Sequence, residues 1–413
     1  MSSSIKAEIS KIGALAALTQ YPGSFVVTLV LLLSACSQQA PSETGTVDSS
    51  GVQIVTSTPA SSEATCTFSE EPVLIIGDDE EDDNQWFSTI LGMGRLSDGS
   101  VAVVDRTSAE VRIFDASGHH LRSIGQGGEG PGEFTIPYFL WVAAGDTLWV
   151  GDFYPWRYNV FTAQGQFVRR LGLEPMYINP SKAGGVLENG YTVNARSNFY
   201  TRTPDFDVPD TMIVEIHNPD GKLVGNLAWI PDRIYGKVSE ASEFFWLHTL
   251  FGAGAKVDAL GSTIVLAHES KPEVQVLDEE SNLRMTIRWS EPNREVTRAD
   301  VRAWREDYRE RRSPSDWDQD DDAMISPERP VADVFPVISN IMIGRDGRIW
   351  IHRYDRPRED RGWLAFDADG KFACHMAQLP GDVWEFGADY VLLLYESELG
   401  AETVRMHSLT SPS

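Results

Sequence analysis

The chain has 413 residues and a formal net charge of −26, because 61 Asp and Glu outweigh 35 Lys and Arg. This balance argues against a nucleic-acid-binding protein, since the phosphates of DNA and RNA are met by clustered Lys and Arg. The length exceeds that of one ordinary domain, but a repeat fold can lengthen as a single domain because each unit packs only on its neighbours.

Residues 1–35 predict a secretory signal peptide. Lys6 and Lys11 precede an apolar run over 25–33, which is short for a membrane span. The run ends in Leu33-Ser-Ala-Cys36, which resembles a bacterial lipobox, the sequence at which Cys36 is lipidated and becomes the first residue of the mature chain. An ordinary cleaved signal with an incidental Cys36 is the alternative. Residues 36–66 are rich in Ser, Thr, Pro and Glu, which predicts a flexible tether.

These features predict a lipid-anchored, extracytoplasmic protein of the bacterial cell envelope, at the outer membrane where the cell has two membranes. Cys66 and Cys374 would then lie in a compartment that permits disulfides. Sequence supplies no Cα separation, so two free thiols are slightly preferred over a bridge.

A repeated pattern appears at 111–125 and 159–172. Each copy has a strand, a turn that ends at Gly118 or Gly165, and a second strand that ends at Gly125 or Gly172. The upstream strands over 98–105 and 145–152 also match. A repeat of this size is typical of a repeat architecture, and its four short strands predict a β-propeller.

We count six blades of four antiparallel strands over 67–413, although five or seven stay open because blades three and four are weakly patterned. The first five blades are complete, with the first strand of blade four predicted over 250–257, whereas the C-terminus supplies only three strands of the last one. An N-terminal strand at 72–76, or the earlier one at 52–55, is expected to complete it, so that the closing blade is shared by both ends of the chain.

One segment, about 297–312, breaks the strand pattern and predicts an inserted helix. Thr297 and Asp300 resemble a capping box, while Val301, Trp304 and Tyr308 share one face. We expect this helix to pack at the junction of blades four and five; the alternative is a lid over one mouth of the ring. An acidic loop is predicted over 316–322.

The segment 125–134, Gly-Gln-Gly-Gly-Glu-Gly-Pro-Gly-Glu-Phe, links two blades. Together with the Asp-Gly strands and the Phe-Asp-x-x-Gly turns, it resembles the NHL-type six-bladed propeller, and the whole mature chain resembles bacterial six-bladed propeller lipoproteins of that group. The resemblance implies a fold and a secreted location, and very little biochemistry, because propellers host unrelated activities.

The polar residues that end the second strand of each blade are the candidate site. They form a predicted rim at one mouth of the ring, or else they brace loops, and they are Asp105, Asp152, Arg196, His268, Arg353 and Tyr395. We favour bracing for Asp105 and Asp152, since an Asp at a strand end commonly ties the next turn. The cations among the six would suit an anionic ligand, unless each pairs with a neighbouring carboxylate. Trp141, with Trp156 and nearby tyrosines, is an alternative aromatic surface.

No catalytic motif or repeated set of metal ligands is evident, so no catalytic residue and no cofactor is predicted. Calcium stays possible, because Asp105, Asp152, Asn194 and Asn340 could supply oxygen ligands. The sequence therefore favours a monomeric, membrane-tethered propeller that binds a small molecule or a partner protein and is not an enzyme. The alternative is a metal-dependent hydrolase or lyase with a central-channel site built around His268, Arg353, Arg196 and Asp152.

Overall fold

The computed structural model describes residues 45–49, 51–57, 64–79, 81–153, 156–176, 184–197, 210–240, 243–313, 315, 317–397 and 400–412. The chain divides into Met1–Pro41 and Ser42–Ser413, and all described residues belong to the second unit. The predicted signal peptide, the lipidation residue Cys36 and the start of the tether lie outside them. Within these ranges, neither α-helix has the length and apolar character needed to cross a membrane.

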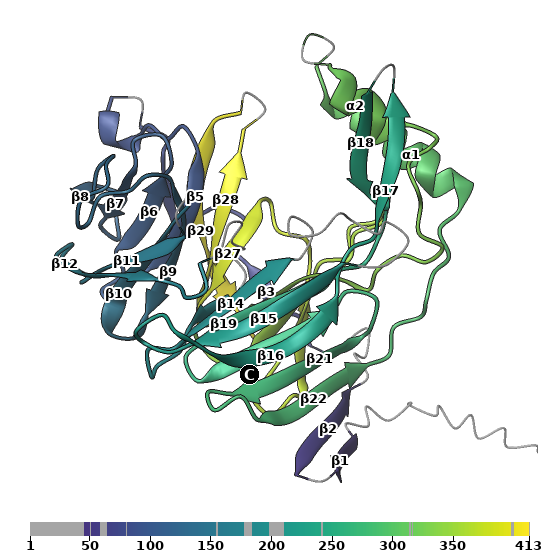
Figure 1. The fold of residues 1–413 in the computed structure, drawn as a ribbon, viewed down its shortest axis with the longest axis horizontal. Helices are drawn as coiled ribbons and strands as arrows, with labels where there is room; N and C mark the ends of the chain where they lie inside the picture. The colour runs from purple at the N-terminus through teal and green to yellow at the C-terminus, as the bar shows by residue number, and fades with distance from the viewer. Residues whose placement is uncertain are drawn as a thin grey trace, which may run out of the picture. The chain divides into compact units, whose positions relative to one another are not determined.

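Six four-stranded antiparallel units follow one another along the chain (Figure 1). Numbered as blades one to six, they are β5 (Ile90–Arg95), β6 (Val101–Asp105), β7 (Glu110–Phe114) and β8 (His120–Ile124); β9 (Pro137–Ala143), β10 (Thr147–Asp152), β11 (Arg157–Phe161) and β12 (Phe167–Gly172); β13 (Gly184–Val186), β14 (Thr192–Ser197), β15 (Thr211–His217) and β16 (Leu223–Pro231); β19 (Ala255–Leu260), β20 (Thr263–His268), β21 (Glu273–Asp278) and β22 (Leu283–Trp289); β23 (Ile338–Ile343), β24 (Ile349–Arg353), β25 (Trp363–Phe366) and β26 (Phe372–Met376); and β27 (Asp382–Phe386), β28 (Tyr390–Glu396), β29 (Glu402–Thr410) with β4 (Leu74–Ile76).

The first strands of the six blades form a ring. Strand β5 contacts β9, and contacts continue through β13, β19, β23 and β27 back to β5. Blades three and four merge into one sheet, because Gly184 of β13 pairs in parallel with Asp258 of β19. The predicted six-bladed β-propeller is therefore confirmed, with blade four beginning at Ala255 and not at residue 250 as the pattern suggested.

Packing between blades explains why β6, the second strand of blade one, is apolar on both faces. In β6, Val101 and Val103 join the core shared with blade six, whereas Ala102 and Val104 join the core shared with blade two. All four are fully buried. Side chains alternate across a strand, so a strand such as β6, which packs against a neighbouring blade on each face, needs apolar residues at successive positions.

The predicted Phe-Asp-x-x-Gly turns join the outer two strands of a blade. In blade one, the Asp115 carboxylate accepts hydrogen bonds from the backbone N–H groups of Ser117 and His119, at 2.8 and 3.0 Å. Gly118 has a φ of 88°, and Gly370 of blade five has 76° at the same place. A positive φ costs little for Gly and an Asp side chain ties the turn, so both residue types serve the hairpin.

The N-terminal segment covers the outer edges of blades four, five and six in chain order. Strands β1 (Gly45–Ser49) and β2 (Val52–Ser57) form a hairpin, and β2 pairs in parallel with β22. The backbone near Thr65 then pairs with β26, and β3 (Thr67–Phe68) and β4 pair with β29.

This segment corrects one expectation and decides between two alternatives for another. Residues 45–49 and 51–57 of the predicted tether are a structured hairpin, because Val55 is 1% exposed and joins the core between blades four and five. Strand β4 closes the ring, as the first alternative predicted, whereas the strand at 52–55 extends blade four.

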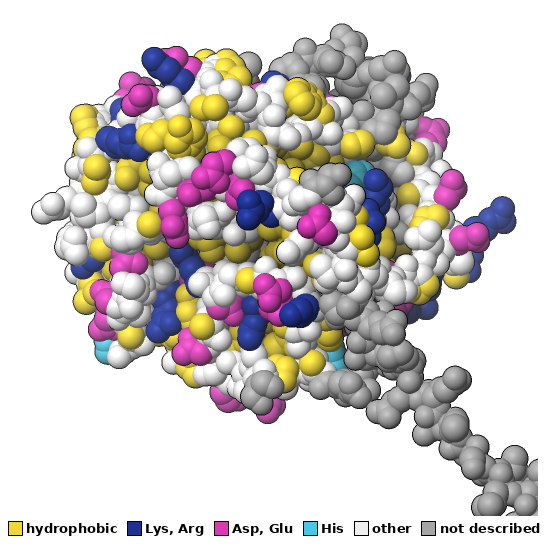
Figure 2. Space-filling model, turned by 90° about the horizontal axis from the view of Figure 1, so that it is seen from below, with side chains coloured by type: hydrophobic (Ala, Val, Ile, Leu, Met, Phe, Trp, Pro, Cys, Tyr) yellow, Lys and Arg dark blue, Asp and Glu magenta, His cyan; other side chains and the backbone are white. Residues whose placement is uncertain are grey.

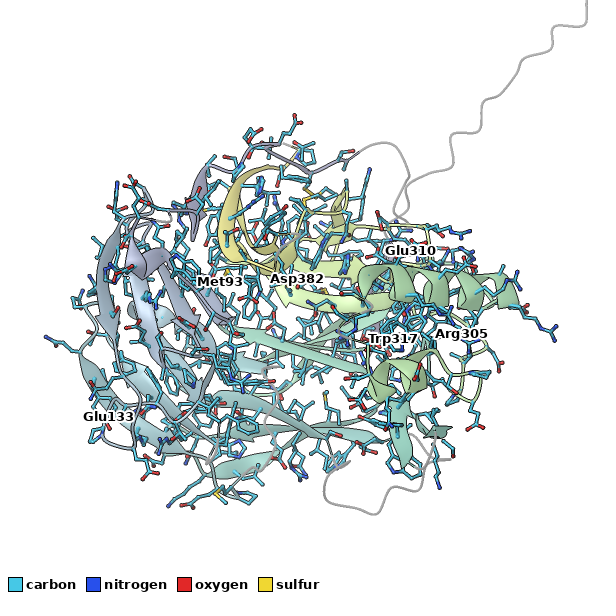
Figure 3. All side chains as sticks on the ribbon, turned by 90° about the horizontal axis from the view of Figure 1, so that it is seen from above. Met93, Glu133, Arg305, Glu310, Trp317 and Asp382 are labelled. Carbon is cyan, nitrogen blue, oxygen red and sulfur yellow. A yellow bond between two sulfur atoms is a disulfide. The ribbon has the colours of Figure 1, made fainter. Side chains whose placement is uncertain are left out.

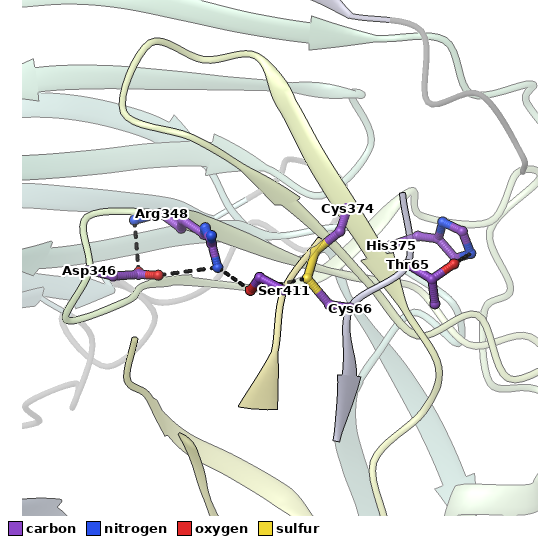
Figure 4. Close-up of a disulfide and its surroundings, with 7 residues drawn as sticks. All are labelled: Thr65, Cys66, Asp346, Arg348, Cys374, His375 and Ser411. Carbon is purple, nitrogen blue, oxygen red and sulfur yellow. Dashed lines mark hydrogen bonds and ion pairs between the residues drawn. A yellow bond between two sulfur atoms is a disulfide. The ribbon is translucent and has the colours of Figure 1, made fainter. Parts of the chain in front are cut away.

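Cys66 and Cys374 form a disulfide, so the preference for two free thiols is wrong (Figure 4). The Cα atoms lie 5.6 Å apart, within the range that a disulfide requires. The backbone brings them together, since the Cys66 N–H donates to the His375 carbonyl at 2.9 Å and the His375 N–H to the Ala64 carbonyl at 3.0 Å.

Two insertions rise from the ring at the upper right of Figure 1. One is the hairpin of β17 (Tyr235–Glu240) and β18 (Glu243–His248), between blades three and four, and the other holds α1 (Arg298–Arg311) and α2 (Gln319–Ile325), between blades four and five. Two short 3-10 turns cover Asp83–Gln85 and Ala144–Asp146. The capping box of Thr297 and Asp300 is present, as predicted.

Helix α1 packs on the segments that lead into blades four and five, with Val301 and Trp304 against Phe251 and Phe335. The predicted acidic loop over 316–322 is wrong from residue 319 onward, because this stretch begins α2. Asp318 and Asp321 form a second capping box, and acidic side chains in the first turn suit the positive end of a helix dipole.

Replacing both Cys66 and Cys374 with Ser is expected to lower the free energy of unfolding by about 2–4 kcal/mol. The bridge joins residues 308 positions apart and holds the segment that closes the ring. Guanidinium unfolding of the wild type, of the wild type with reductant and of the double variant will measure it. The reduced wild type should match the double variant; equal stability of the oxidised and reduced wild type would contradict the prediction.

Candidate functional site

A central cavity of about 640 Å³ is the candidate site. Every inner strand contributes to its lining: Met93 from β5; Phe139, Leu140 and Trp141 from β9; Gly184 from β13; Ala255, Lys256, Val257 and Asp258 from β19; Asn340, Ile341 and Met342 from β23; and Asp382, Val383 and Trp384 from β27. In the view from above, Met93 and Asp382 lie near the middle of the ring (Figure 3). A volume of this size suits a small molecule.

An ion pair obstructs the channel at the ends of the inner strands. The Arg345 guanidinium of blade five lies 2.6 Å from the Glu385 carboxylate of blade six, and it donates a 2.8 Å hydrogen bond to the Val142 carbonyl of blade two. Glu385 also accepts from the Arg95 backbone N–H at 3.3 Å, and from the Tyr390 hydroxyl. Arg345 therefore crosses the channel between opposite blades, beside a smaller cavity of about 100 Å³.

Aromatic side chains form much of the cavity wall. Trp141 and Trp384 are half-buried, whereas Trp363 is buried and stacks on the His352 ring at a centroid distance of 4.6 Å. His352 is held in place at both nitrogens, by the Ser339 hydroxyl at 2.6 Å and the Gln378 side-chain oxygen at 2.9 Å. The wall is thus apolar and rigid on one side.

The second histidine of the cavity, His248, comes from the inserted hairpin. Its ring stacks on Tyr235 at a centroid distance of 4.1 Å. Burial lowers the pKa of His248 to about 4, and the nearby Arg233 and Arg329 act in the same direction. His248 is therefore neutral at physiological pH.

The cations of the cavity are already paired with a carboxylate. The Lys256 ammonium lies 3.1 Å from Glu269 and the Arg233 guanidinium 3.8 Å from it. Glu269 is buried, and it also accepts a 2.7 Å hydrogen bond from the Gly254 backbone N–H.

The aspartates of the cavity differ from these cations. Asp232, Asp258 and Asp382 have no ion-pair partner among the residues that the structure describes. Asp258 accepts a 2.6 Å hydrogen bond from the Ile343 backbone N–H. Burial raises the pKa of Asp258 to about 6, so the carboxylate is ionised at neutral pH at a cost in free energy.

Asp105 and Asp152, two of the six predicted rim residues, are buried at the ends of β6 and β10. Asp105 pairs with Arg112 at 3.2 Å and Asp152 with Arg157 at 2.7 Å, in each case on the next strand. Asp152 also accepts from the Ile136 backbone N–H at 2.7 Å. These are the loop-bracing contacts that the sequence favoured for both residues.

The predicted rim cations also have carboxylate partners. Arg196 lies 3.0 Å from the Glu215 carboxylate, and Glu215 is 1% exposed. Arg353 lies 3.7 Å from the carboxylate of Glu291, whose side chain is 8% exposed. Burial lowers the pKa of Arg353. Both guanidinium groups are therefore committed to pairs outside the residues that line the central cavity.

The last two rim residues also lie outside the central lining. The His268 ring bonds to the Ser270 hydroxyl at 2.7 Å and lines a separate side cavity of about 870 Å³ between β16 and blade four. The Tyr395 ring packs under the Arg405 guanidinium, 3.4 Å from the centroid. By register, four of the six end strands and pair with the first residue of an inner strand, so they lie one strand outside the cavity lining; the four are Asp105, Asp152, His268 and Arg353.

Asp258 was missed because the pattern ended the first strand of blade four at residue 257, whereas Lys256 was missed although it lay within that strand. In the observed β19, charged side chains alternate with Ala255, Val257 and Ala259, and this alternation on an inner strand is the signal that was available. Trp141 and Asn340 were singled out and do line the cavity, whereas Trp156 is 2% exposed.

The arrangement of possible metal ligands bears on the predicted calcium option. Within the described ranges, no three His, Cys, Asp or Glu side chains lie together in a way that could hold a metal ion. Of the four oxygen donors considered, Asp105 and Asp152 pair with arginines, and the Asn194 amide bonds to Tyr158 and His217. Asn340 alone lines the cavity.

Comparison with known proteins agrees with the fold. A family described as a 6-bladed beta-propeller matches residues 91–154, and no curated protein sequence matches the chain. A solved protein from Bacteroides fragilis described as exported has 10% identity over 87% of this chain and 100% of its own, with a TM-score of 0.47. A gluconolactonase from Xanthomonas campestris has 13% identity over 79% of this chain and 87% of its own, with a TM-score of 0.38. A virginiamycin B lyase from Staphylococcus aureus has 8% identity over 84% of this chain and 99% of its own, with a TM-score of 0.37. Likenesses of this size carry no inference about activity.

Replacing Arg345 with Met is expected to lower the free energy of unfolding by about 3 kcal/mol, because it leaves the Glu385 carboxylate largely buried and unpaired. Denaturant unfolding measures the change. The control is Lys371→Met, in the same blade, whose pair with Asp369 is solvent-exposed and is worth less than about 1 kcal/mol. Equal losses in the two variants would show that the pair across the channel has no special role.

Replacing Asp258 with Asn is expected to stabilise the protein by about 1–3 kcal/mol at pH 8. The folded-state pKa of about 6 exceeds the ordinary 3.8, so the folded protein binds the proton more tightly and wild-type stability falls as pH rises between these values. The advantage of the Asn variant should become small near pH 4, where the folded wild type is protonated and the unfolded wild type is partly protonated. Unfolding curves from pH 4 to 8 measure it; a variant that is less stable at every pH would refute the prediction.

Proposed function

We propose that this protein is a non-catalytic propeller that binds a small molecule in its central cavity, outside the cytoplasm and tethered to a membrane through lipid on Cys36. The cavity carries the proposal, because residues from all six inner strands converge on it and Arg345 crosses the channel beyond it. A pocket that opens mainly at one mouth buries more of a ligand than a through-channel does.

The side chains of the cavity favour binding over catalysis. The described lining holds no Ser, Thr or Cys, so it offers no side-chain nucleophile of these types for either histidine to activate. His352 is bonded at both nitrogens, and the His248 ring is stacked and neutral. The Ser339 hydroxyl that bonds to His352 does not belong to the residues that line the cavity.

Two observations support the location. The lipobox-like sequence at 33–36 follows a signal-like apolar run. The Cys66–Cys374 bridge is of a kind that persists in oxidising compartments and is rare in the cytosol.

The test blocks the cavity with a larger side chain and measures ligand binding. In ligand-observed NMR with a library of small molecules, Asn340→Trp is expected to weaken binding at least tenfold, because Asn340 is half-buried in the cavity lining. Leu121→Trp is the matched control, since Leu121 is 50% exposed on the outer strand β8. Ligands should bind the wild type and the control alike.

Trp141→Ala, which removes part of the wall, serves as a second variant, and circular dichroism checks that each variant is folded. Binding that survives both cavity variants would place the ligand elsewhere on the surface. A library without a single ligand for the wild type would also defeat the proposal.

A further inference from the structure

We infer that the ligand of the central cavity is a small organic ammonium ion, a protonated amine with an apolar body, and that the Asp258 carboxylate holds its charged group. This inference rests on the proposed function and adds the chemical class of the ligand. It reverses the sign of charge that the predicted rim of Arg196, His268 and Arg353 suggested.

The first step is the charge that the cavity leaves unpaired. Its two cations, Arg233 and Lys256, share the buried carboxylate of Glu269. The three aspartates of the lining have no such partner within the described ranges. On a protein of net charge −26, the cavity therefore attracts cations and repels anions.

The second step is the wall. Trp141 and Trp384 are half-buried in the lining, and Met93 and Met342 add apolar surface beside them. An indole ring attracts a cation through its negative face and also covers an apolar body. An inorganic ion has no apolar body for this wall to cover, and the lining holds no cluster of metal ligands in the described chain.

The third step is the position of Asp258. It lines both the main cavity and the smaller one beside Arg345, so it lies at the inner end of the pocket. One oxygen accepts from the Ile343 N–H. The neighbouring cations form their direct ion pairs with other carboxylates, Arg345 with Glu385 and Lys256 with Glu269, although the charge of Arg345 acts on Asp258 and opposes the rise in its pKa that burial causes.

The last step is energetic. An ionised carboxylate in this half-buried position destabilises the empty protein, as its raised pKa indicates. Residues that cost stability in this way concentrate at functional sites, and an ammonium group would offset the cost on binding. Asp258 therefore stabilises the complex although it destabilises the free protein.

The outer surface of the protein differs from the cavity: on the face seen from below, acidic and basic side chains are interspersed (Figure 2). Inside the cavity this balance is lost, because two cations, Arg233 and Lys256, face four carboxylates, namely Glu269 and the three aspartates of the lining. The ammonium group has two possible sources, a free amine or the side chain of a lysine, and both present the same chemistry to Asp258.

The experiment compares three probes that share one apolar body and differ in the charge of the head group: 2-phenylethylammonium, 2-phenylethanol and 3-phenylpropanoate. Isothermal titration of the full-length protein at pH 7.5 is expected to give the ammonium probe at least tenfold higher affinity than the alcohol, with the carboxylate weakest. Nα-acetyl-lysine methylamide forms a fourth arm, which shows whether a lysine side chain binds as well as the free amine.

Asp258→Asn should weaken the ammonium probe at least tenfold and leave the alcohol within twofold. Because this variant is expected to be more stable than the wild type, unfolding cannot explain a loss of binding. Asp369→Asn is the matched control, since Asp369 lies in an exposed turn of blade five. This variant should bind the ammonium probe as tightly as the wild type does.

The inference is overturned if the alcohol or the carboxylate binds as tightly as the ammonium probe, if Asp258→Asn keeps full affinity, or if none of the probes binds. In each of these cases, library ligands that Asn340→Trp excludes would leave the proposed function standing. Failure of both experiments would reject the two together.

Discussion

The pairing of β4 with β29 is the interaction on which the rest of the molecule depends. It joins a strand from the N-terminal part of the chain to the last strand, so the ring is held by backbone hydrogen bonds between segments far apart in sequence. Closure removes the free edge of blade six and brings β27 against β5. A central cavity with six walls exists only in the closed ring, and so does the contact of Arg345 with the opposite blade.

Local repetition made the architecture predictable. The turns at Asp115 and Gly118 and the strands beside them recur in several blades, and each copy contains the information for its own fold. The hairpin β17–β18 escaped notice because its alternation is like that of a blade strand. The second helix was hidden by its acidic first turn, which also reads as a loop.

The candidate site was less predictable, because its contacts join residues far apart in sequence. Arg345 pairs with Glu385, which is 40 residues away in sequence, and with the Val142 carbonyl, which is 203 residues away. No sequence period indicates such contacts. The polar strand ends identified the correct end of the ring, yet the strands beside them line the cavity. Neutralisation of Lys256 by Glu269 is likewise a property of the fold, since composition alone cannot say which charges are left over.

The order of the N-terminal contacts has a mechanical consequence. A pull on the chain ahead of Gly45 would first load the hairpin β1–β2 on blade four, and would then reach the covalent bond between Cys66 and Cys374. The strands that close the ring, β3 and β4, come after Cys66 in the chain, so the bridge diverts the force into blade five before it reaches them. A propeller held by its N-terminus could thus lose its outer hairpin under tension and still keep a closed ring.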